Sequence, residues 1–414
     1  MRTDDAQPSA EDGGPWGVQH SFARRGIQSP NRSPRVALIS PLPAGQGSEP
    51  ESGVGHYLVE ILERLSDRFD VTVLAGSDTN YRRIGRAKVV PTWTPDSRCV
   101  YQILSALRSV RPDVIHLQHE FNLFGGLLPT ALLTGTIAAG RALGRPPVTT
   151  IHGVIDKSAI TPAFLARNDL PTWPLAARAS LSLAYRIITM ASSKVIVHHE
   201  HFQSVLRDSY GADGTKIEVI PFGSDHQSVP RPTTTTRRSN GTTILVFGFL
   251  AGYKMPELVV QLAEERLLPN AVFRFCVGRN PRVASAEYVK RYSDLADRVH
   301  ALGSRAIWSG YVPDDELPDI FSSSDVVVLP YTDCLSGSAV ASLAQAHGVS
   351  VCYSRALRPL FGTSSAEFEL DTRSLACAIS ARQGRTPDQN AELTTWAESA
   401  ERNESIWAEA AAIS

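Results

Sequence analysis

The sequence predicts an α/β protein made of two doubly wound halves that face each other across a cleft. Short β-branched and apolar runs alternate with helical stretches along most of the chain, which is typical of parallel sheets with helices on both faces. A polar, proline-containing segment, Val229–Gly241, interrupts this alternation, which then restarts. Glycine, histidine and lysine residues follow the ends of the runs, where open α/β sheets bind their ligands.

The chain divides into five predicted segments. Residues 1–34 are polar and lack periodicity, so we expect a disordered tail. An N-terminal domain is expected over residues 35–228 and a C-terminal domain over 241–385, joined by a linker at 229–240. Residues 386–414 are rich in Ala and Glu and are expected to form terminal helices, for which a course back to the N-terminal domain is one prediction.

The predicted strands of the two halves are short runs of β-branched and apolar residues. In the first half they are Arg35–Ile39, Val71–Leu74, Val114–Leu117, Val148–Ile151, Lys194–Val197 and Lys216–Ile220. In the second half they are Ile244–Phe247, Val272–Val277, Ala306–Tyr311, Val326–Leu329 and Val349–Tyr353. Helices are expected between most of them, for example at Gly55–Arg68 and Tyr101–Arg111.

Composition argues against several classes of function. The 414 residues include 41 basic and 42 acidic side chains, a balance that does not favour nucleic acid or an anionic membrane surface as a partner. The five cysteines are widely spaced and predict reduced thiols in a cytoplasmic protein. The uncharged run Phe121–Gly140 contains a proline and four glycines, so we expect a loop and a buried helix there, and no transmembrane segment.

A glycine turn and a lysine follow the first predicted strand of the second half. In Thr243–Leu258 the strand reaches Phe247, Gly248 opens a turn, and Lys254 precedes a helix start. Backbone N–H groups at a helix N-terminus bind anions such as a diphosphate, and Lys254 adds positive charge. Taken alone, the stretch is better explained as an ordinary strand–turn–helix with a surface lysine.

The order of motifs along the chain resembles that of the GT-B fold glycosyltransferases, and within them the retaining family 4 group. The resemblance runs from about Arg35 to Asp371. The matching segments are SGVG (52–55), PDVIHLQHE (112–120), VTTIHG (148–153), KIEVIPFGSD (216–225), FGFLAGYK (247–254), SGYVPDDELPDIFSSSDVVVLPY (309–331) and SGSAVASLAQAHGVSV (336–351). It implies two Rossmann-like domains, with a nucleotide-sugar donor held by the C-terminal one and an acceptor by the N-terminal one.

The resemblance also implies roles for individual residues. Lys254 would neutralise the donor diphosphate as the leaving group gains charge, and the amides of Gly53 and Gly55 would do so from the other side. His152 would contact a sugar hydroxyl or phosphate, with a structural strand-end histidine as the alternative. His119 and Glu120 are acceptor-binding candidates, for which a structural role is equally compatible.

The candidate donor-binding residues lie at the strand ends and helix starts that match the family. They are Gly53, Gly55, Gly248, Phe249, Arg279, Tyr311, Val312, Ser336, Gly337 and Ser338. No Asp-x-Asp motif is present, so we expect neither a metal ion nor a cofactor beyond the nucleotide-sugar co-substrate. His198, His199 and His201 are predicted not to converge on a metal, because neighbouring strand residues point to opposite faces.

Three features depart from the family pattern. Phe249 occupies the place of a common arginine, for which Arg279 is the candidate substitute. Leu335 and Leu343 occupy the places of a glutamate pair that meets the donor sugar and ribose; Ser336, Ser338 and Asp333 are candidate replacements. Phe222 stands where a polar residue is common.

Two classes of function therefore stay open. The first is a metal-independent retaining transferase that moves a sugar from a nucleotide-diphosphate donor to a small-molecule acceptor, in natural-product biosynthesis. The second is a degenerate GT-B protein that binds a ligand or partner without sugar transfer. An epimerase or phosphorylase on the same fold is a third, less favoured alternative.

Overall fold

The computed structural model describes residues 32–44, 53–120, 123–124, 129, 133–136, 140–141, 146–168, 170, 172–224, 241–280, 283, 285–382 and 394–413. Most of the tail predicted at 1–34, and all of the linker predicted at 229–240, lie outside the described residues. So does much of the uncharged run Phe121–Gly140. None of the described helices is long and apolar enough to cross a membrane.

The first half contains an eight-stranded sheet in the order β3-β4-β2-β1-β5-β6-β7-β8. The strands are β1 Arg35–Ile39, β2 Asp70–Gly76, β3 Arg83–Ile84, β4 Ala87–Trp93, β5 Val114–His119, β6 Val148–Ile151, β7 Lys194–Val197 and β8 Ile217–Val219. All neighbours pair in parallel except β3 and β4. The central strands are buried on both faces, which explains their continuous apolar runs.

The second half contains a parallel six-stranded sheet in the order β11-β10-β9-β12-β13-β14. The strands are β9 Thr243–Phe249, β10 Val272–Gly278, β11 Ala306–Trp308, β12 Val326–Leu329, β13 Ser350–Ser354 and β14 Glu367–Phe368. Its apolar residues form a core cluster that extends from β9 to helix α12.

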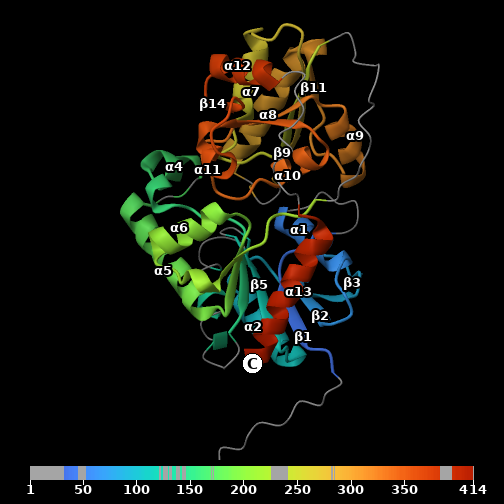
Figure 1. Ribbon diagram of the computed structural model, residues 1–414, viewed down its shortest axis with the longest axis vertical. Helices are drawn as coiled ribbons and strands as arrows, with labels where there is room; N and C mark the ends of the chain where they lie inside the picture. The colour runs from blue at the N-terminus through green and yellow to red at the C-terminus, as the bar shows by residue number, and fades with distance from the viewer. Residues whose placement is uncertain are drawn as a thin grey trace, which may run out of the picture. The chain divides into compact units, whose positions relative to one another are not determined.

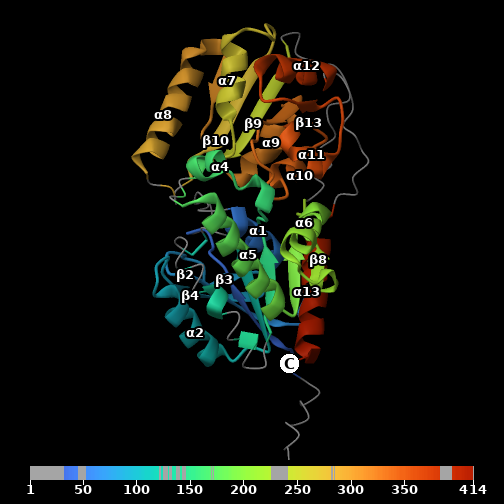
Figure 2. The same cartoon turned by 90° about the vertical axis from the view of Figure 1, so that its left-hand side faces the viewer.

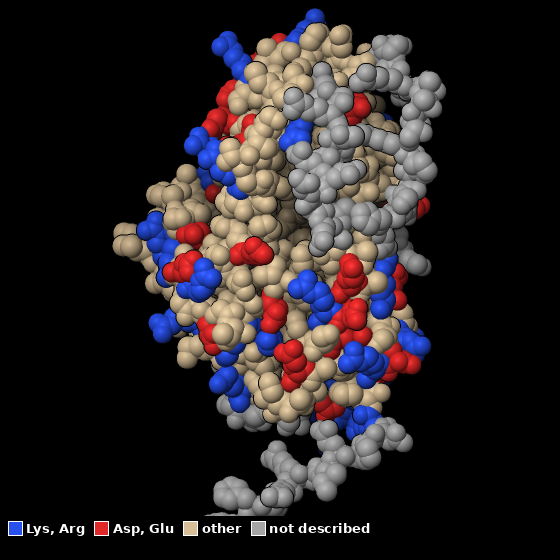
Figure 3. Space-filling model, viewed as in Figure 1, with Lys and Arg blue, Asp and Glu red and all other residues tan. Residues whose placement is uncertain are grey.

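Helices flank both faces of each sheet (Figures 1 and 2). In the first half they are α1 Gly53–Glu63, α2 Cys99–Val110, α4 Pro162–Arg167, α5 Pro174–Ala191 and α6 Glu200–Tyr210. In the second half they are α7 Pro256–Glu264, α8 Ala286–Ala301, α9 Leu317–Ser322, α10 Ala339–Ala346, α11 Arg358–Phe361 and α12 Thr372–Arg382, followed by α13 Trp396–Ile413. The face shown in Figure 3 carries interspersed basic and acidic side chains.

All eleven predicted strands are present, with ends that differ by up to three residues. The strand β4 was not predicted because Pro91 interrupts its pattern; its pairing with β2 shifts register beside this proline, as at a β-bulge. The helix predicted at Gly55–Arg68 ends at Glu63 instead. Ser66 donates hydrogen bonds from its backbone N–H and its hydroxyl to the Glu404 carboxylate, both at 2.8 Å. The helix therefore ends before Ser66.

The order of the strands places the candidate residues at two special positions. In each sheet the chain continues in opposite directions from one central pair of strands, β1 and β5 in the first and β9 and β12 in the second. Beyond the carboxyl ends of such a pair the connecting loops diverge and leave room for a ligand. The Gly53 helix start follows β1, and Lys254 follows β9.

The last helix, α13, packs on the first sheet although it follows the second half in sequence (Figure 1). Trp407 is fully buried there and donates its indole N–H to Nδ1 of His116 on β5 at 2.9 Å. Glu404 holds Ser66, and Glu409 lies 3.3 Å from the ammonium of Lys194. The terminal helix therefore completes the core of the first half.

Replacing Trp407 tests this packing. Trp407→Ala removes a fully buried ring and leaves a cavity, so we expect the free energy of unfolding to fall by about 3–5 kcal/mol, as measured by urea denaturation. Ile413→Ala on the same helix is the control, because this side chain is 67% exposed and its loss should change stability by less than about 0.5 kcal/mol. Equal effects of the two substitutions would contradict the packing.

Candidate functional site

Lys254 is placed by a short pairing between two loops at the carboxyl edge of the second sheet. Met255 donates its backbone N–H to Pro330 at 2.9 Å, and Thr332 donates to Tyr253 at 2.8 Å. Lys254 and Tyr331 thereby form an antiparallel bridge. The loop after β9 is thus held against the loop after β12, and the lysine stands at the point where the strand order reverses.

Two tyrosine rings flank the Lys254 ammonium. Its Nζ lies 5.4 Å from the centre of the Tyr331 ring and 5.9 Å from that of Tyr253, within the range of a cation–π contact. Burial lowers the pKa of Lys254 to about 8, while the negative charge of Glu120 opposes this shift. A lysine in these surroundings gains from a second negative charge, such as that of a diphosphate.

Each of the two tyrosines has a serine as a hydrogen-bond partner. Both serines are among the donor-binding candidates predicted from the sequence. Burial raises the pKa of Tyr253, with Ser336 as an opposing hydrogen-bond partner. It also raises the pKa of Tyr331, which Ser338 opposes in the same way. Ser338 additionally caps α10 by accepting the N–H of Ala341 at 3.2 Å. Lys254 and the two serines are therefore gathered around one pair of tyrosine rings.

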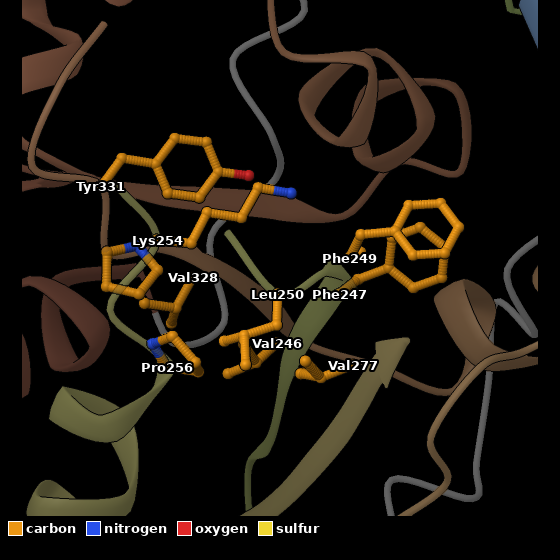
Figure 4. Close-up of a pocket in the computed structure, with 11 residues that line it drawn as sticks. Val246, Phe247, Phe249, Leu250, Lys254, Pro256, Val277, Val328 and Tyr331 are labelled. Carbon is orange, nitrogen blue, oxygen red and sulfur yellow. The ribbon is translucent and has the colours of Figure 1, made fainter. Parts of the chain in front are cut away.

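A small hollow lies beside Lys254 (Figure 4). Its walls come from β9, β10, β12 and the two paired loops: Val246, Phe247, Gly248, Phe249, Leu250, Lys254, Pro256, Val277, Val328, Pro330 and Tyr331. The volume is about 10 Å³, which is room for about one water molecule. A diphosphate therefore has to bind on the outer side of Lys254, or the Tyr331 ring has to move.

Gly248 lets the chain turn close to the lysine. Its φ of +109° lies in a region that only glycine adopts without strain. An added Cβ would lie 3.1 Å from Nζ of Lys254. The glycine at this position is therefore explained by the backbone turn and by the room that the lysine side chain needs.

The two glycines at the start of α1 differ in their surroundings. A Cβ on Gly55 would lie 3.2 Å from Pro43 Cδ and 3.3 Å from the carbonyl oxygen of Pro41. A Cβ on Gly53 would meet no atom of the described residues within 4 Å. Gly55 thus allows close packing within the protein, whereas the surroundings of Gly53 leave room for a ligand at the helix N-terminus.

His152 is buried, and both of its ring nitrogens have partners. Nε2 lies 2.7 Å from the amide oxygen Oε1 of Gln118, and Nδ1 lies 3.1 Å from Nε2 of His198. The other nitrogen of His198, Nδ1, lies 2.8 Å from the carbonyl oxygen of Ile220. A direct contact of the His152 ring with a sugar hydroxyl would have to replace one of these hydrogen bonds.

The same hydrogen bonds continue on the other side of Gln118. Its amide lies 3.3 Å from Nε2 of His116, which is also 2.8 Å from the hydroxyl of Thr150. Nδ1 of His116 accepts the indole N–H of Trp407. A continuous set of hydrogen bonds therefore runs from α13 through β5 and β6 to the end of β8.

Aromatic rings enclose His152 and His198. Tyr57 of α1 meets both imidazoles edge-on at 5.1 Å, and Phe222 stacks on His198 at 4.1 Å. Burial lowers the pKa of His198 to about 4 and that of His152 well below its usual value. Both imidazoles are therefore neutral near pH 7. Phe222, which departs from the family pattern, has become part of this apolar enclosure.

The remaining candidate donor residues differ in whether they are exposed or packed against other residues. Phe249 and Tyr311 stack, with ring centres 6.2 Å apart, so the usual place of an arginine is occupied by an aromatic pair. The Val312 side chain is buried in the core, which leaves its backbone groups for any contact with a ligand. Arg279 is exposed beyond β10. A Cβ on Gly337 would lie 3.3 Å from Cβ of His198.

The acceptor-binding candidates lie at the end of β5. His119 is buried, which lowers its pKa to about 4, so it is neutral near pH 7. Glu120 is partly buried, and its charge acts on Lys254 and Tyr253. The structure thus brings Glu120 near the lysine.

The two leucines at the places of the family's glutamates pack against apolar cores. Leu335 packs on the core of the first half and Leu343 on that of the second. The carbonyl oxygen of Leu335 accepts the backbone N–H of Val154 at 2.9 Å. Apolar side chains at these positions therefore stabilise the fold.

Two ion pairs join residues of the two halves near the candidate groups. His56, which follows Gly55, lies 3.3 Å from Asp314, and Arg167 of α4 lies 2.9 Å from Asp333. Asp333, a candidate replacement for a lost glutamate, is thus engaged by an arginine. Among the described residues, no three His, Cys, Asp or Glu side chains are grouped so that they could hold a metal ion.

Comparison with known proteins agrees with this arrangement. The sequence profile of Glycosyltransferase Family 4 matches residues 52–228. This part of the chain is therefore similar to a glycosyltransferase family 4 domain. The family 4-like domain thus covers most of the first half, from the helix start at Gly53 to the end of the described β8 loop.

Curated relatives match part of the chain. Mannosylfructose-phosphate synthase of Agrobacterium fabrum is 27% identical over 204 residues, which are 45% of this chain and 44% of that protein. The 2-deoxystreptamine glucosyltransferase of Streptomyces kanamyceticus is 26% identical over 226 residues, 51% of this chain and 54% of that protein. The chain therefore spans about half the length of the curated relatives it matches.

Solved structures extend the similarity to the second half. HepE from Anabaena, crystallised with UDP-glucose, superposes with a TM-score of 0.61 over 92% of this chain and 97% of that chain, at 18% identity. At this identity the match shows the fold alone. The fold is GT-B, with two Rossmann-like domains, and the predicted fold class is confirmed.

Sequence reasoning missed several residues of the site. Tyr253 and Tyr331 flank Lys254, and their place directly beside the lysine and directly after β12 was the available signal. From the sequence, Gln118 was included only as part of a matching segment, and His198 only as a residue that is not expected to bind a metal. In the structure both side chains lie within hydrogen-bonding distance of His152. No local signal linked Trp407 to this site, because its contact depends on where α13 packs.

The two glycines of α1 provide a matched test of their surroundings. Gly55→Val should lower the free energy of unfolding by about 1–3 kcal/mol, because the new side chain meets the Pro41–Pro43 backbone. Gly53→Ala should be neutral or raise it by up to about 1 kcal/mol, because the unfolded chain loses entropy and nothing clashes. Urea denaturation measures both values, and a larger loss for Gly53→Ala would contradict the geometry.

Proposed function

We propose that this protein is a glycosyltransferase that binds a nucleotide-diphosphate sugar between Lys254 and the N-terminus of α1. The observation that carries the proposal is the place of Lys254, partly buried at the reversal of strand order in the second sheet. The Gly53 helix start occupies the corresponding place in the first sheet. The UDP-glucose complex of HepE, which has the same fold, supports a nucleotide sugar as donor.

The proposed role of Lys254 is to stabilise the leaving group. Breaking the bond between the sugar C1 and the phosphate oxygen leaves negative charge on the diphosphate, and a fixed ammonium lowers the energy of that charge. The positive end of the α1 helix dipole favours the same charge. These groups supply positive charge without a metal ion, and we propose that the reaction is metal-independent.

We further propose that the transfer retains the configuration at C1. The acceptor oxygen attacks C1 on the face from which the diphosphate leaves, and the acceptor proton passes to the departing phosphate oxygen. This route needs no carboxylate nucleophile, which fits the apolar side chains at positions 335 and 343. Glu120 near Lys254 is the candidate to orient the acceptor hydroxyl.

A small-molecule acceptor in natural-product biosynthesis is the proposed co-substrate. One curated relative is named for the acceptor 2-deoxystreptamine, and the family 4-like domain is the half that would bind the acceptor. We propose a cytoplasmic location, consistent with free cysteines among the described residues.

A second candidate function is nucleotide binding without transfer. The stacking of Phe249 on Tyr311, and the packing of Leu335 and Leu343 into apolar cores, favour it. Incubation with a panel of nucleotide sugars separates the two candidates. A transferase releases the sugar slowly to water when no acceptor is present, whereas a binding protein returns the nucleotide sugar intact.

Replacing Lys254 tests the proposed diphosphate site. Calorimetric titration with UDP, GDP and dTDP should show binding of at least one diphosphate, weakened about 10- to 150-fold in Lys254→Ala, since a hydrogen bond to a charged group is lost. Lys290→Ala is the control, because this lysine is exposed on α8 and pairs with Asp294. Equal affinities of the two variants would contradict the proposal.

The pH dependence of binding offers an independent test. The pKa of Lys254 is lowered to about 8, so the ammonium is fully present near pH 6 and is lost as the pH rises through 8. Calorimetry should therefore show UDP-glucose affinity falling between about pH 7 and pH 9. Lys254→Arg keeps its charge throughout this range and should bind with an affinity that does not change with pH. A flat profile for the unsubstituted protein would argue against Lys254.

A further inference from the structure

The hydrogen bonds around His152 have two ends whose direction is fixed by chemistry. At one end the Trp407 indole can only donate, and it faces Nδ1 of His116 at 2.9 Å. At the other end the carbonyl oxygen of Ile220 can only accept, and it faces Nδ1 of His198 at 2.8 Å. The groups between them are imidazoles and one amide, which can each donate on one side and accept on the other.

The Ile220 end fixes the protons on His198 and His152. Nδ1 of His198 must carry a proton, so in a neutral ring its Nε2 accepts. Its neighbour at 3.1 Å, Nδ1 of His152, must then donate. Nε2 of His152 is consequently an acceptor. In the structure the Gln118 atom 2.7 Å away is the amide oxygen Oε1, so the amide has to be turned by 180° to bring its amino group to His152.

The Trp407 end leads to the same orientation of the amide. Nδ1 of His116 accepts, so its proton lies on Nε2, which faces the Thr150 hydroxyl at 2.8 Å and the Gln118 amide at 3.3 Å. The Thr150 hydroxyl can accept from a protonated Nε2, but an amide amino group cannot, so the amide oxygen is the group that fits beside His116. A 180° turn of an amide exchanges its oxygen and nitrogen, and the hydrogen bonds decide between the two orientations.

The reverse assignment of donors and acceptors along these hydrogen bonds is incompatible with both ends. It would place an unprotonated Nδ1 of His198 against the carbonyl of Ile220, and the Gln118 amino group against the protonated Nε2 of His116. A positive charge on His198 could repair one end only, and Phe222 and Tyr57 enclose that ring. One arrangement of neutral rings therefore gives every contact one donor and one acceptor.

We propose that Gln118, His116, His198 and Trp407 are positioning residues that hold His152 neutral, with its proton on Nδ1 and its Nε2 lone pair taken by Gln118. Only the relevance of this assignment to catalysis rests on the proposed transfer. In the proposed transfer, His152 neither donates nor accepts a proton at Nε2. It anchors the backbone at Gly153, where a Cβ would lie 3.2 Å from the carbonyl oxygen of Leu335.

Nitrogen NMR of the histidine rings tests the assignment without any ligand, so failed nucleotide binding would not affect it. The full chain is labelled with imidazole ¹⁵N, and long-range proton–nitrogen spectra at pH 7 separate protonated from unprotonated ring nitrogens. Replacement of single histidines by glutamine assigns the signals. We expect the proton on Nε2 of His116 and on Nδ1 of both His152 and His198; a proton on Nε2 of His152 alone would overturn the proposal.

Two variants test how the direction is set. In Trp407→Phe the donor at one end is lost, so His116 should become a mixture of tautomers while His152 and His198 keep their protons on Nδ1. Gln118→Glu offers only acceptors and a negative charge, so His152 should become protonated on both nitrogens at pH 7. An unchanged His152 spectrum in a folded Gln118→Glu variant would contradict the proposal.

If the Gln118→Glu variant does not fold, the Gln118→Met variant serves for the same test. This side chain has a similar length and offers no N–H donor, and the end at Ile220 is untouched. His152 and His198 should keep their protons on Nδ1, and the Nε2 signal of His152 should move because its hydrogen bond is lost. An Nε2 signal that stays in place would show that Gln118 does not donate to His152.

Discussion

The Lys254 ammonium, placed beside the Tyr253 and Tyr331 rings at the edge of the second sheet, is the constraint on which the proposed site depends. Its position follows from backbone pairing of the loops after β9 and β12. Burial lowers the pKa of this lysine, and the negative charge of Glu120 opposes the shift. The two ring contacts also favour the charged form. An anion at this place would stabilise the charged lysine, and the same interaction would stabilise a leaving diphosphate.

The first half contributes rigidity to the site. Its central strands end in a buried polar network, which α13 closes from one side and the β8 end from the other. A buried network of this kind is stable only when all of its members are satisfied. The network therefore ties the last helix of the chain to the strand end that precedes His152 and Gly153, far from the helix in sequence.

The sequence was sufficient for the fold because each parallel strand is a continuous apolar run that ends in a glycine or a polar residue. It was also sufficient for the gathering of Lys254, Ser336 and Ser338, since all three lie beyond strand ends of one sheet; Gly248 lies inside β9, next to its last residue. It failed at β4, where Pro91 breaks the pattern and pairing with β2 supplies the stability instead. It could not link Trp407 to His116, because that contact joins residues 291 positions apart.

The absence of a glutamate pair and of an arginine changes what the site can do. Leu335, Leu343 and Phe249 make apolar contacts that a charged side chain could not make. The sugar and ribose hydroxyls of a donor would therefore need other partners, and Ser336 and Ser338 lie close enough to Lys254 to serve. The proposed site thus combines a lysine placed to bind phosphate with a sugar subsite of unusual composition.

A crystal structure of the chain with UDP tests the central claim most directly. The account predicts that the diphosphate lies within hydrogen-bonding distance of Nζ of Lys254 and of the backbone N–H groups that begin α1, with the Tyr331 ring turned away from the ammonium. A diphosphate bound elsewhere, with Lys254 still beside the Tyr253 and Tyr331 rings, would contradict this account.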